Sequence, residues 1–148
     1  MRFILDTNVV MSALISRVET GPPRVLLEAL ADAHFESVVS PALVLEWREV
    51  SQRPKLRRYF RLDAAGVEFA LTRIEQLSDM IDPQPAATAA PDQGDAHLWA
   101  ILAADPESVL VTGDGPLLDA PFGPDRVITP AQAVDKLQTS RGGSILGA

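Results

Sequence analysis

The sequence predicts an α/β fold in which helices cover both faces of a parallel sheet. Short apolar runs rich in β-branched residues alternate with stretches whose apolar residues recur at helical spacing, and this alternation is typical of such a sheet. Polar turns at residues 6–8 and 112–115 directly follow two of the apolar runs. With 148 residues, 47% of them apolar and 22% charged, the chain has the length and composition of one globular domain.

Four short segments are expected as strands because they are apolar and end in polar turns. They are residues 3–5, 35–39, 108–111 and 127–128. A further short strand is expected after residue 80. Since no internal repeat is visible, we expect one sheet.

The segments between the strands are expected as helices because their apolar residues fall on one face. A helix is expected after the first polar turn. The others are residues 22–31, a segment from Pro41 interrupted at Arg53-Pro54, residues 64 to about 80 with Asp63 as N-cap, residues 96–104 and residues 130–138. The Pro-rich residues 82–91 predict a loop. We expect a single domain over residues 1–138 and a flexible C-terminal tail over residues 139–148.

Composition excludes several kinds of chemistry. The chain has no cysteine, so it has no disulfide, thiolate nucleophile or zinc–thiolate cluster. Its two histidines, His34 and His97, cannot form an imidazole-rich metal site, and His97 is expected to be a packed or surface side chain. Catalytic chemistry is therefore expected to use carboxylates.

No membrane segment or export signal is predicted. The longest apolar runs fall well short of the ~20 residues that a transmembrane helix needs, and the run at residues 3–5 is too short for a signal peptide. We therefore expect a cytoplasmic protein.

Two aspartates follow predicted strands directly. Ligands of parallel sheets bind at the carboxyl ends of the strands, where the winding order reverses. Asp6 and Asp114 therefore share one edge if their strands are central neighbours. Each also has a structural alternative, because Asp6 can cap a helix and the sequence Gly-Asp-Gly around Asp114 is common in turns.

Three further acids have similar alternatives when taken singly. Asp92 and Asp95 flank a helix start, where negative charge is favourable, and a lone Glu46 in a helix is usually a solvated residue. As a set, carboxylates provide the oxygen ligands that Mg²⁺ and Mn²⁺ prefer. Gathering several of them in one pocket is electrostatically unfavourable without a cation.

The order and spacing of four motifs resemble the PIN domain family over residues 1 to about 130. The motifs are Ile-Leu-Asp-Thr-Asn-Val-Val at residues 4–10, Leu-Val-Leu-Glu-Trp at residues 43–47, Asp-Ala-His-Leu-Trp-Ala at residues 95–100 and Leu-Val-Thr-Gly-Asp at residues 110–114. The resemblance implies a PIN-like three-layer α/β/α fold with a central, mostly parallel sheet. It also implies a metal-dependent ribonuclease, because PIN domains have that activity and many are toxins of type II toxin–antitoxin pairs.

Carried over residue by residue, the resemblance makes Asp6, Glu46, Asp95 and Asp114 the catalytic and metal-binding carboxylates. Asn8 and Thr112 match the polar positions that orient carboxylates or phosphate. Asp92 is an additional acid nearby, and whether Asp92 or Asp95 lies closer to the metal stays open. The implied cofactor is Mg²⁺ or Mn²⁺, and the implied partners are RNA, a cognate antitoxin and a second copy of the chain.

The formal charge of −7 argues against RNA binding, but the Lys and Arg residues are unevenly distributed along the chain. Six of the thirteen Lys and Arg residues lie in residues 48–61, which we call the basic segment. They are Arg48, Arg53, Lys55, Arg57, Arg58 and Arg61. We expect the last five to contact RNA, with Tyr59 and Phe60 stacking on unpaired bases. The alternative is a solvated surface without a ligand.

Three other functions are weighed against the ribonuclease. A phosphatase of the haloacid dehalogenase type needs a second acid two residues after its first aspartate, where this chain has Asn8. A phospho-receiver domain needs an acid pair on the first loop and a lysine near the fifth strand, and neither is evident. A catalytically inactive PIN-like binding module retains the fold without metal binding, and Mn²⁺ uptake distinguishes it from the enzyme.

Overall fold

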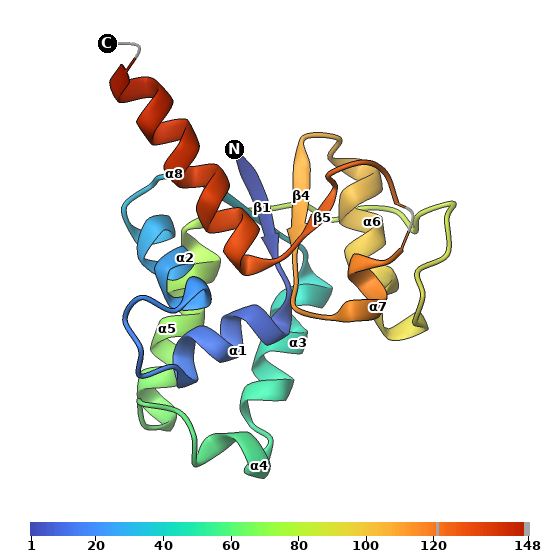
Figure 1. Ribbon diagram of the computed structural model, residues 1–148. Helices are drawn as coiled ribbons and strands as arrows, with labels where there is room; N and C mark the ends of the chain where they lie inside the picture. The colour runs from blue at the N-terminus through green and yellow to red at the C-terminus, as the bar shows by residue number, and fades with distance from the viewer. Residues whose placement is uncertain (121, 147–148) are drawn as a thin grey trace.

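The computed structural model describes residues 1–120 and 122–146 (Figure 1). The strands are β1 (Arg2–Leu5), β2 (Glu36–Val39), β3 (Ser78–Met80), β4 (Ser108–Val111) and β5 (Val127–Ile128). The helices are α1 (Thr7–Ile15), α2 (Pro22–Ala31), α3 (Pro41–Ser51), α4 (Pro54–Arg57), α5 (Ala64–Gln76), α6 (Ala96–Ala104), α7 (Gly115–Leu118) and α8 (Pro130–Leu146), with a 3₁₀ turn, η1 (Gln93–Asp95), before α6.

The five strands form one sheet in the order β3-β2-β1-β4-β5, and every neighbouring pair is parallel. Helix α6 packs beside β4 on one side of the sheet, while α2 packs against both α1 and α8 on the other side (Figure 1). This confirms the predicted α/β/α layers. The winding reverses between β1 and β4, because β2 and β3 extend the sheet one way and β4 and β5 the other.

The two central strands are covered on both faces. Phe3, Ile4 and Leu5 of β1 and Leu110 and Val111 of β4 are completely buried. This explains why both strands are continuous apolar runs instead of alternating ones. Two buried central strands hold the polar residues that follow them in fixed positions.

Arg2 binds three carboxylates at the amino ends of the strands. Its guanidinium nitrogens lie 2.6 Å from Glu36 of β2, 2.8 Å from Asp79 of β3 and 2.8 Å from Asp105, which precedes β4. Each of these three acids is therefore in direct contact with a protein cation.

Two predicted helix ends are wrong. The helix expected to reach about Met80 ends at Gln76, because Ser78–Met80 pair with β2 as strand β3. The Ser78 hydroxyl lies 2.8 Å from that of Ser37 and 2.6 Å from the carbonyl of Ile74, so contacts with the sheet override the local helical pattern. Helix α8 continues to Leu146 instead of ending at residue 138.

Residues 147 and 148, the end of the predicted tail, lie outside the described residues, and the flexibility of residues 139–148 stays a prediction. Within the described residues, every helix lacks the length or the apolar character that spanning a bilayer requires.

Candidate active site

The pairing of β1 with β4 places Asp6 beside the turn that carries Asp114. Leu5 is in register with Val111, and the backbone N–H of Asp6 donates to the carbonyl of Val111 at 3.0 Å. Asp6 and the segment 112–114 therefore leave the sheet at the same edge and at the point where the winding reverses. Ligands bind to parallel sheets at this position.

All four predicted carboxylates line one open cavity of about 440 Å³ at this edge. Asp6 comes from the end of β1, Glu46 from α3, Asp95 from the start of α6 and Asp114 from the end of β4. The other lining residues are Thr7, Asn8, Met11, Ser12, Ile15, Val50, Arg53 and Leu56. The structure therefore brings the four acids together, although their catalytic role stays a prediction.

Asp6 is held by three neutral donors. Its Oδ1 accepts a hydrogen bond from the backbone N–H of Thr7 at 2.7 Å, which caps α1, and its Oδ2 accepts from the Thr112 hydroxyl at 2.7 Å and from the Asn8 amide at 3.3 Å. Burial raises the pKa of Asp6 above its usual range, while the hydrogen bonds from Thr112 and Thr7 oppose that rise. Asn8 and Thr112 thus both donate hydrogen bonds to this carboxylate, and their part in a reaction stays a prediction.

Glu46 is held at both oxygens. The Thr7 hydroxyl donates to its Oε1, and Nε2 of His97 lies 3.1 Å from its Oε2. The bond with His97 is the main cause that lowers the pKa of Glu46. Sequence reasoning missed this role of His97. Only the packing of α3 against α6 reveals it, because these two residues are far apart in the chain.

Asp95 and Asp114 contrast with these two acids, because within the described part of the chain their carboxylates accept no hydrogen bond. Asp114 contributes its backbone N–H to the Thr112 hydroxyl at 3.1 Å. Burial, followed by the negative charges of Asp6 and Asp114, raises the pKa of Asp95 to about 6. Burial is thus the larger cause of the shift, and repulsion by the neighbouring carboxylates adds to it.

Asp92 is further from the cavity. It is exposed, and its carboxylate accepts the backbone N–H of Gly94 at 2.8 Å, which caps η1. The geometry therefore favours Asp95 over Asp92 as the residue that faces the cavity.

The donor set has the chemistry that a divalent cation requires. It consists of carboxylate oxygens, two of these carboxylates have no protein donor among the described residues, and Arg53 is the one cation among the described lining residues. The acids are not as close together as ligands of one ion, since no group of three or more Asp, Glu or His side chains in the described residues reaches that arrangement.

The basic segment divides into free and engaged residues. Arg53 lines the cavity, and Lys55, Arg57 and Arg58 are exposed on or beside α4. Arg61 is engaged, because its guanidinium donates to the carbonyl of Ala13 at 3.0 Å and so ties the segment to α1.

Arg48 is engaged as well, since its guanidinium lies 3.7 Å from Glu68 and 3.6 Å from Glu75 of α5.

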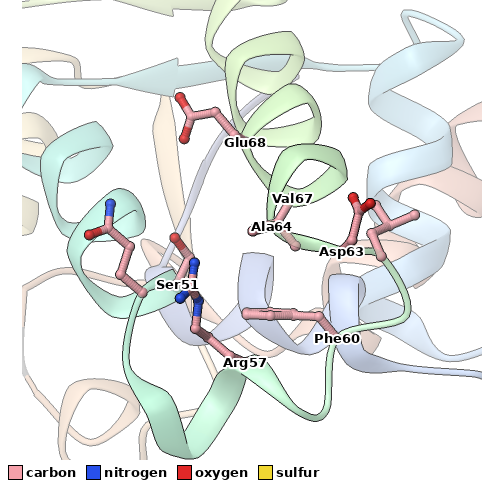
Figure 2. Close-up of a pocket in the computed structure, with 9 residues that line it drawn as sticks. Ser51, Arg57, Phe60, Asp63, Ala64, Val67 and Glu68 are labelled. Carbon is pink, nitrogen blue, oxygen red and sulfur yellow. The ribbon is translucent and has the colours of Figure 1, made fainter.

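The two aromatic residues of the basic segment differ. Tyr59 is 52% exposed, so its ring is accessible for stacking, and the Arg58 guanidinium already lies 5.0 Å from its centroid over one face. Phe60 is 9% exposed, so the expectation that it stacks on bases is wrong. Figure 2 shows why: Phe60 lies beside Arg57 in the wall of a small cavity, between the corner of α3 and α4 and the start of α5.

A family model described as "PIN domain" matches residues 2–115, and the chain therefore belongs to the PIN domain family. PIN domains are typically nucleases and generally use divalent metal ions. The match includes all four acids that line the cavity.

Among solved structures, the fold is similar to that in the crystal structure of PAE2754 from Pyrobaculum aerophilum. The TM-score is 0.62 over 94% of this chain and 90% of that chain, with 17% sequence identity. At this identity the likeness shows a shared fold alone. No curated protein matches the sequence significantly.

Replacing Asp95 by Asn is expected to stabilise the protein in EDTA at pH 7.5. The substitution removes one of the mutually repelling charges. Because Asp95 is only partly buried, solvent screens the repulsion, and we expect a gain of about 1 kcal/mol or less, which raises Tm by up to about 4 °C. Thermal unfolding followed by circular dichroism measures the change.

The direction of the pKa shift gives the pH dependence. Because the folded-state pKa of Asp95 is about 6 and its ordinary value is 3.8, ionisation opposes folding above pH 6. The gain from Asp95→Asn therefore shrinks as the pH falls from 6 to 4. Asp119→Asn makes the same charge change at an exposed position outside the cavity and is expected to leave Tm unchanged. A lower Tm for Asp95→Asn, or an equal gain at pH 4, contradicts the repulsion.

Proposed function

We propose that the protein is a Mg²⁺- or Mn²⁺-dependent endoribonuclease that hydrolyses RNA phosphodiester bonds. The observation that supports this most is the convergence of Asp6, Glu46, Asp95 and Asp114 on one open cavity of a PIN domain. We further propose that the protein is the toxin of a type II toxin–antitoxin pair, acts in the cytoplasm as a homodimer and is inhibited by a cognate antitoxin.

Each acid has a distinct part in the proposed reaction. A bound Mg²⁺ or Mn²⁺ would supply Lewis-acid activation of water and offset the charge of the phosphate. Asp6, Asp95 and Asp114 would hold the ion, since Asp95 and Asp114 have oxygens free of protein donors. Glu46, whose carboxylate is fixed from two sides, would orient the attacking water or a bound ion.

The polar neighbours keep the reacting groups in place. Thr112 and Asn8 donate hydrogen bonds to Oδ2 of Asp6, and the backbone N–H of Thr7 at the start of α1 donates to its Oδ1. Both oxygens of this carboxylate are therefore held in place. Arg53 is exposed at the cavity and carries the positive charge that an RNA phosphate needs beside a cluster of acids.

Asp6→Asn tests the proposed chemistry, because it removes the charge of the most buried acid and retains its shape. We expect Mg²⁺-dependent cleavage of single-stranded RNA to slow at least about 100-fold, equivalent to about 2.7 kcal/mol of activation free energy. Asp119→Asn, an exposed acid outside the cavity, is the matched control and should cleave at the wild-type rate. Undiminished cleavage by Asp6→Asn, in a protein with unchanged circular dichroism, would disprove the mechanism.

The exposed Lys and Arg residues of the basic segment are proposed to bind the RNA backbone. Replacing Arg57 and Arg58 by Ala should weaken RNA binding and reduce the slope of log K against log salt by about 1.4, at about 0.7 for each phosphate contact with a single strand. Fluorescence anisotropy of labelled RNA at several salt concentrations measures this slope. The double variant Arg17→Ala/Arg73→Ala changes the net charge equally at exposed positions outside the segment. Equal slopes for the two double variants would exclude the basic segment as the RNA site.

One alternative function has an observation in its favour. Among the described residues, no three carboxylate or histidine side chains lie as close together as the ligands of one metal ion. Such spacing would suit a PIN-like module that binds a partner without catalysis. The phosphatase alternative is set aside, since the chain belongs to the PIN domain family. Uptake of Mn²⁺ distinguishes the enzyme from the inactive module.

A further inference from the structure

His97 is the neighbour of the acidic cavity that the proposed reaction leaves without a role. It is the second residue of α6, two positions after Asp95, and its Nε2 lies 3.1 Å from Oε2 of Glu46 on α3. The imidazole is 17% exposed, and it also borders a separate apolar cavity of about 230 Å³ between α3 and α6. His97 thus forms part of the wall between the two helices that carry Glu46 and Asp95.

The hydrogen bond has a defined direction. An ionised carboxylate only accepts hydrogen bonds, so Nε2 of His97 is protonated and donates a hydrogen bond to Oε2 of Glu46. Nδ1 of His97 is buried and has no partner among the described residues. In the described part of the chain, the bond to Glu46 is therefore the one hydrogen bond that the imidazole makes.

Glu46 needs such an anchor. Its flexible side chain is 32% exposed, and ordering a glutamate side chain costs up to about 2 kcal/mol of conformational entropy. The negative charges of Asp6 and Asp95 oppose its approach to the cavity. The Thr7 hydroxyl holds Oε1 from α1 and His97 holds Oε2 from α6, so the carboxylate is fixed between two elements.

We propose that His97 is a positioning residue that holds the Glu46 carboxylate in the cavity and thereby sets both the affinity for the divalent cation and the rate of hydrolysis. The proposal deepens the proposed function and rests on it. Residues that orient the ligands of a metal site typically contribute about 10- to 100-fold to metal affinity or activity, and we expect a similar effect from His97. A contact that merely packs α6 against α3 would affect stability and leave both quantities unchanged.

The experiment compares three substitutions of His97 that differ in where they place a donor. Gln carries its amide nitrogen about as far from the backbone as Nε2, Asn reaches only as far as Nδ1, and Leu has no donor. Each variant is titrated with Mn²⁺ by calorimetry, assayed for kcat and KM on single-stranded RNA, and checked for Tm. His34→Leu is the matched control, because His34 is exposed in the turn between α2 and β2.

His97→Leu and His97→Asn are expected to weaken Mn²⁺ binding and lower kcat by about 10- to 100-fold, with KM for RNA unchanged. His97→Gln should restore both quantities to within a few-fold of wild type, and His34→Leu should match wild type. The proposal is overturned if His97→Leu binds Mn²⁺ and cleaves normally, or if His97→Gln is as impaired as His97→Leu at equal Tm.

The failure of the proposed function is distinguishable from the failure of this proposal. A wild-type protein that binds Mn²⁺ but does not cleave RNA refutes the ribonuclease, and the Mn²⁺ affinities of the variants still decide the role of His97. A wild-type protein that takes up no Mn²⁺ refutes both.

Discussion

The parallel pairing of β1 with β4 is the constraint on which the candidate site depends. It aligns the buried carboxyl ends of two strands, so that Asp6 follows one strand and Thr112 and Asp114 follow the other. The hydrogen bond from the Thr112 hydroxyl to Asp6 connects residues that are far apart in sequence and fixes the ends of the two strands relative to each other. Helices α3 and α6 then bring Glu46 and Asp95 to this fixed pair. The cavity is thus a consequence of strand order.

Acidic residues at the amino ends and at the carboxyl ends of the strands have opposite electrostatic surroundings. At the amino ends, Arg2 binds three carboxylates, and these acids stabilise the fold as ion pairs. At the carboxyl ends, the acids face a cavity in which Arg53 is the cation among the described lining residues, and the pKa of Asp95 rises to about 6. Uncompensated charge of this kind is typical of functional sites, where stability is lower than the fold would otherwise allow.

The layers of the fold could be predicted from the sequence, because buried strands are continuous apolar runs that end in polar turns. The four acids could be proposed from the order of the motifs, and their catalytic role stays a prediction. The sequence was insufficient where tertiary contacts determine the secondary structure, the burial or the partner of a residue. Ser78–Met80 continue a helical pattern but pair with β2, Phe60 lies in a basic run but is buried, and His97 meets Glu46 only through packing of α6 on α3. The partners of the basic residues are also decided by tertiary contacts, since Arg48 and Arg61 are engaged while Arg57 and Arg58 are exposed.

The central claim is that the cavity is a divalent cation site, and calorimetric titration of the metal-free wild-type protein with Mn²⁺ tests it most directly. Asp114→Asn, which alters a carboxylate that accepts no hydrogen bond among the described residues, serves as the comparison. The account predicts uptake by the wild type at pH 7.5 and an affinity at least about 10-fold weaker for Asp114→Asn. Absence of uptake by the wild type, or uptake that Asp114→Asn leaves unchanged, would contradict it.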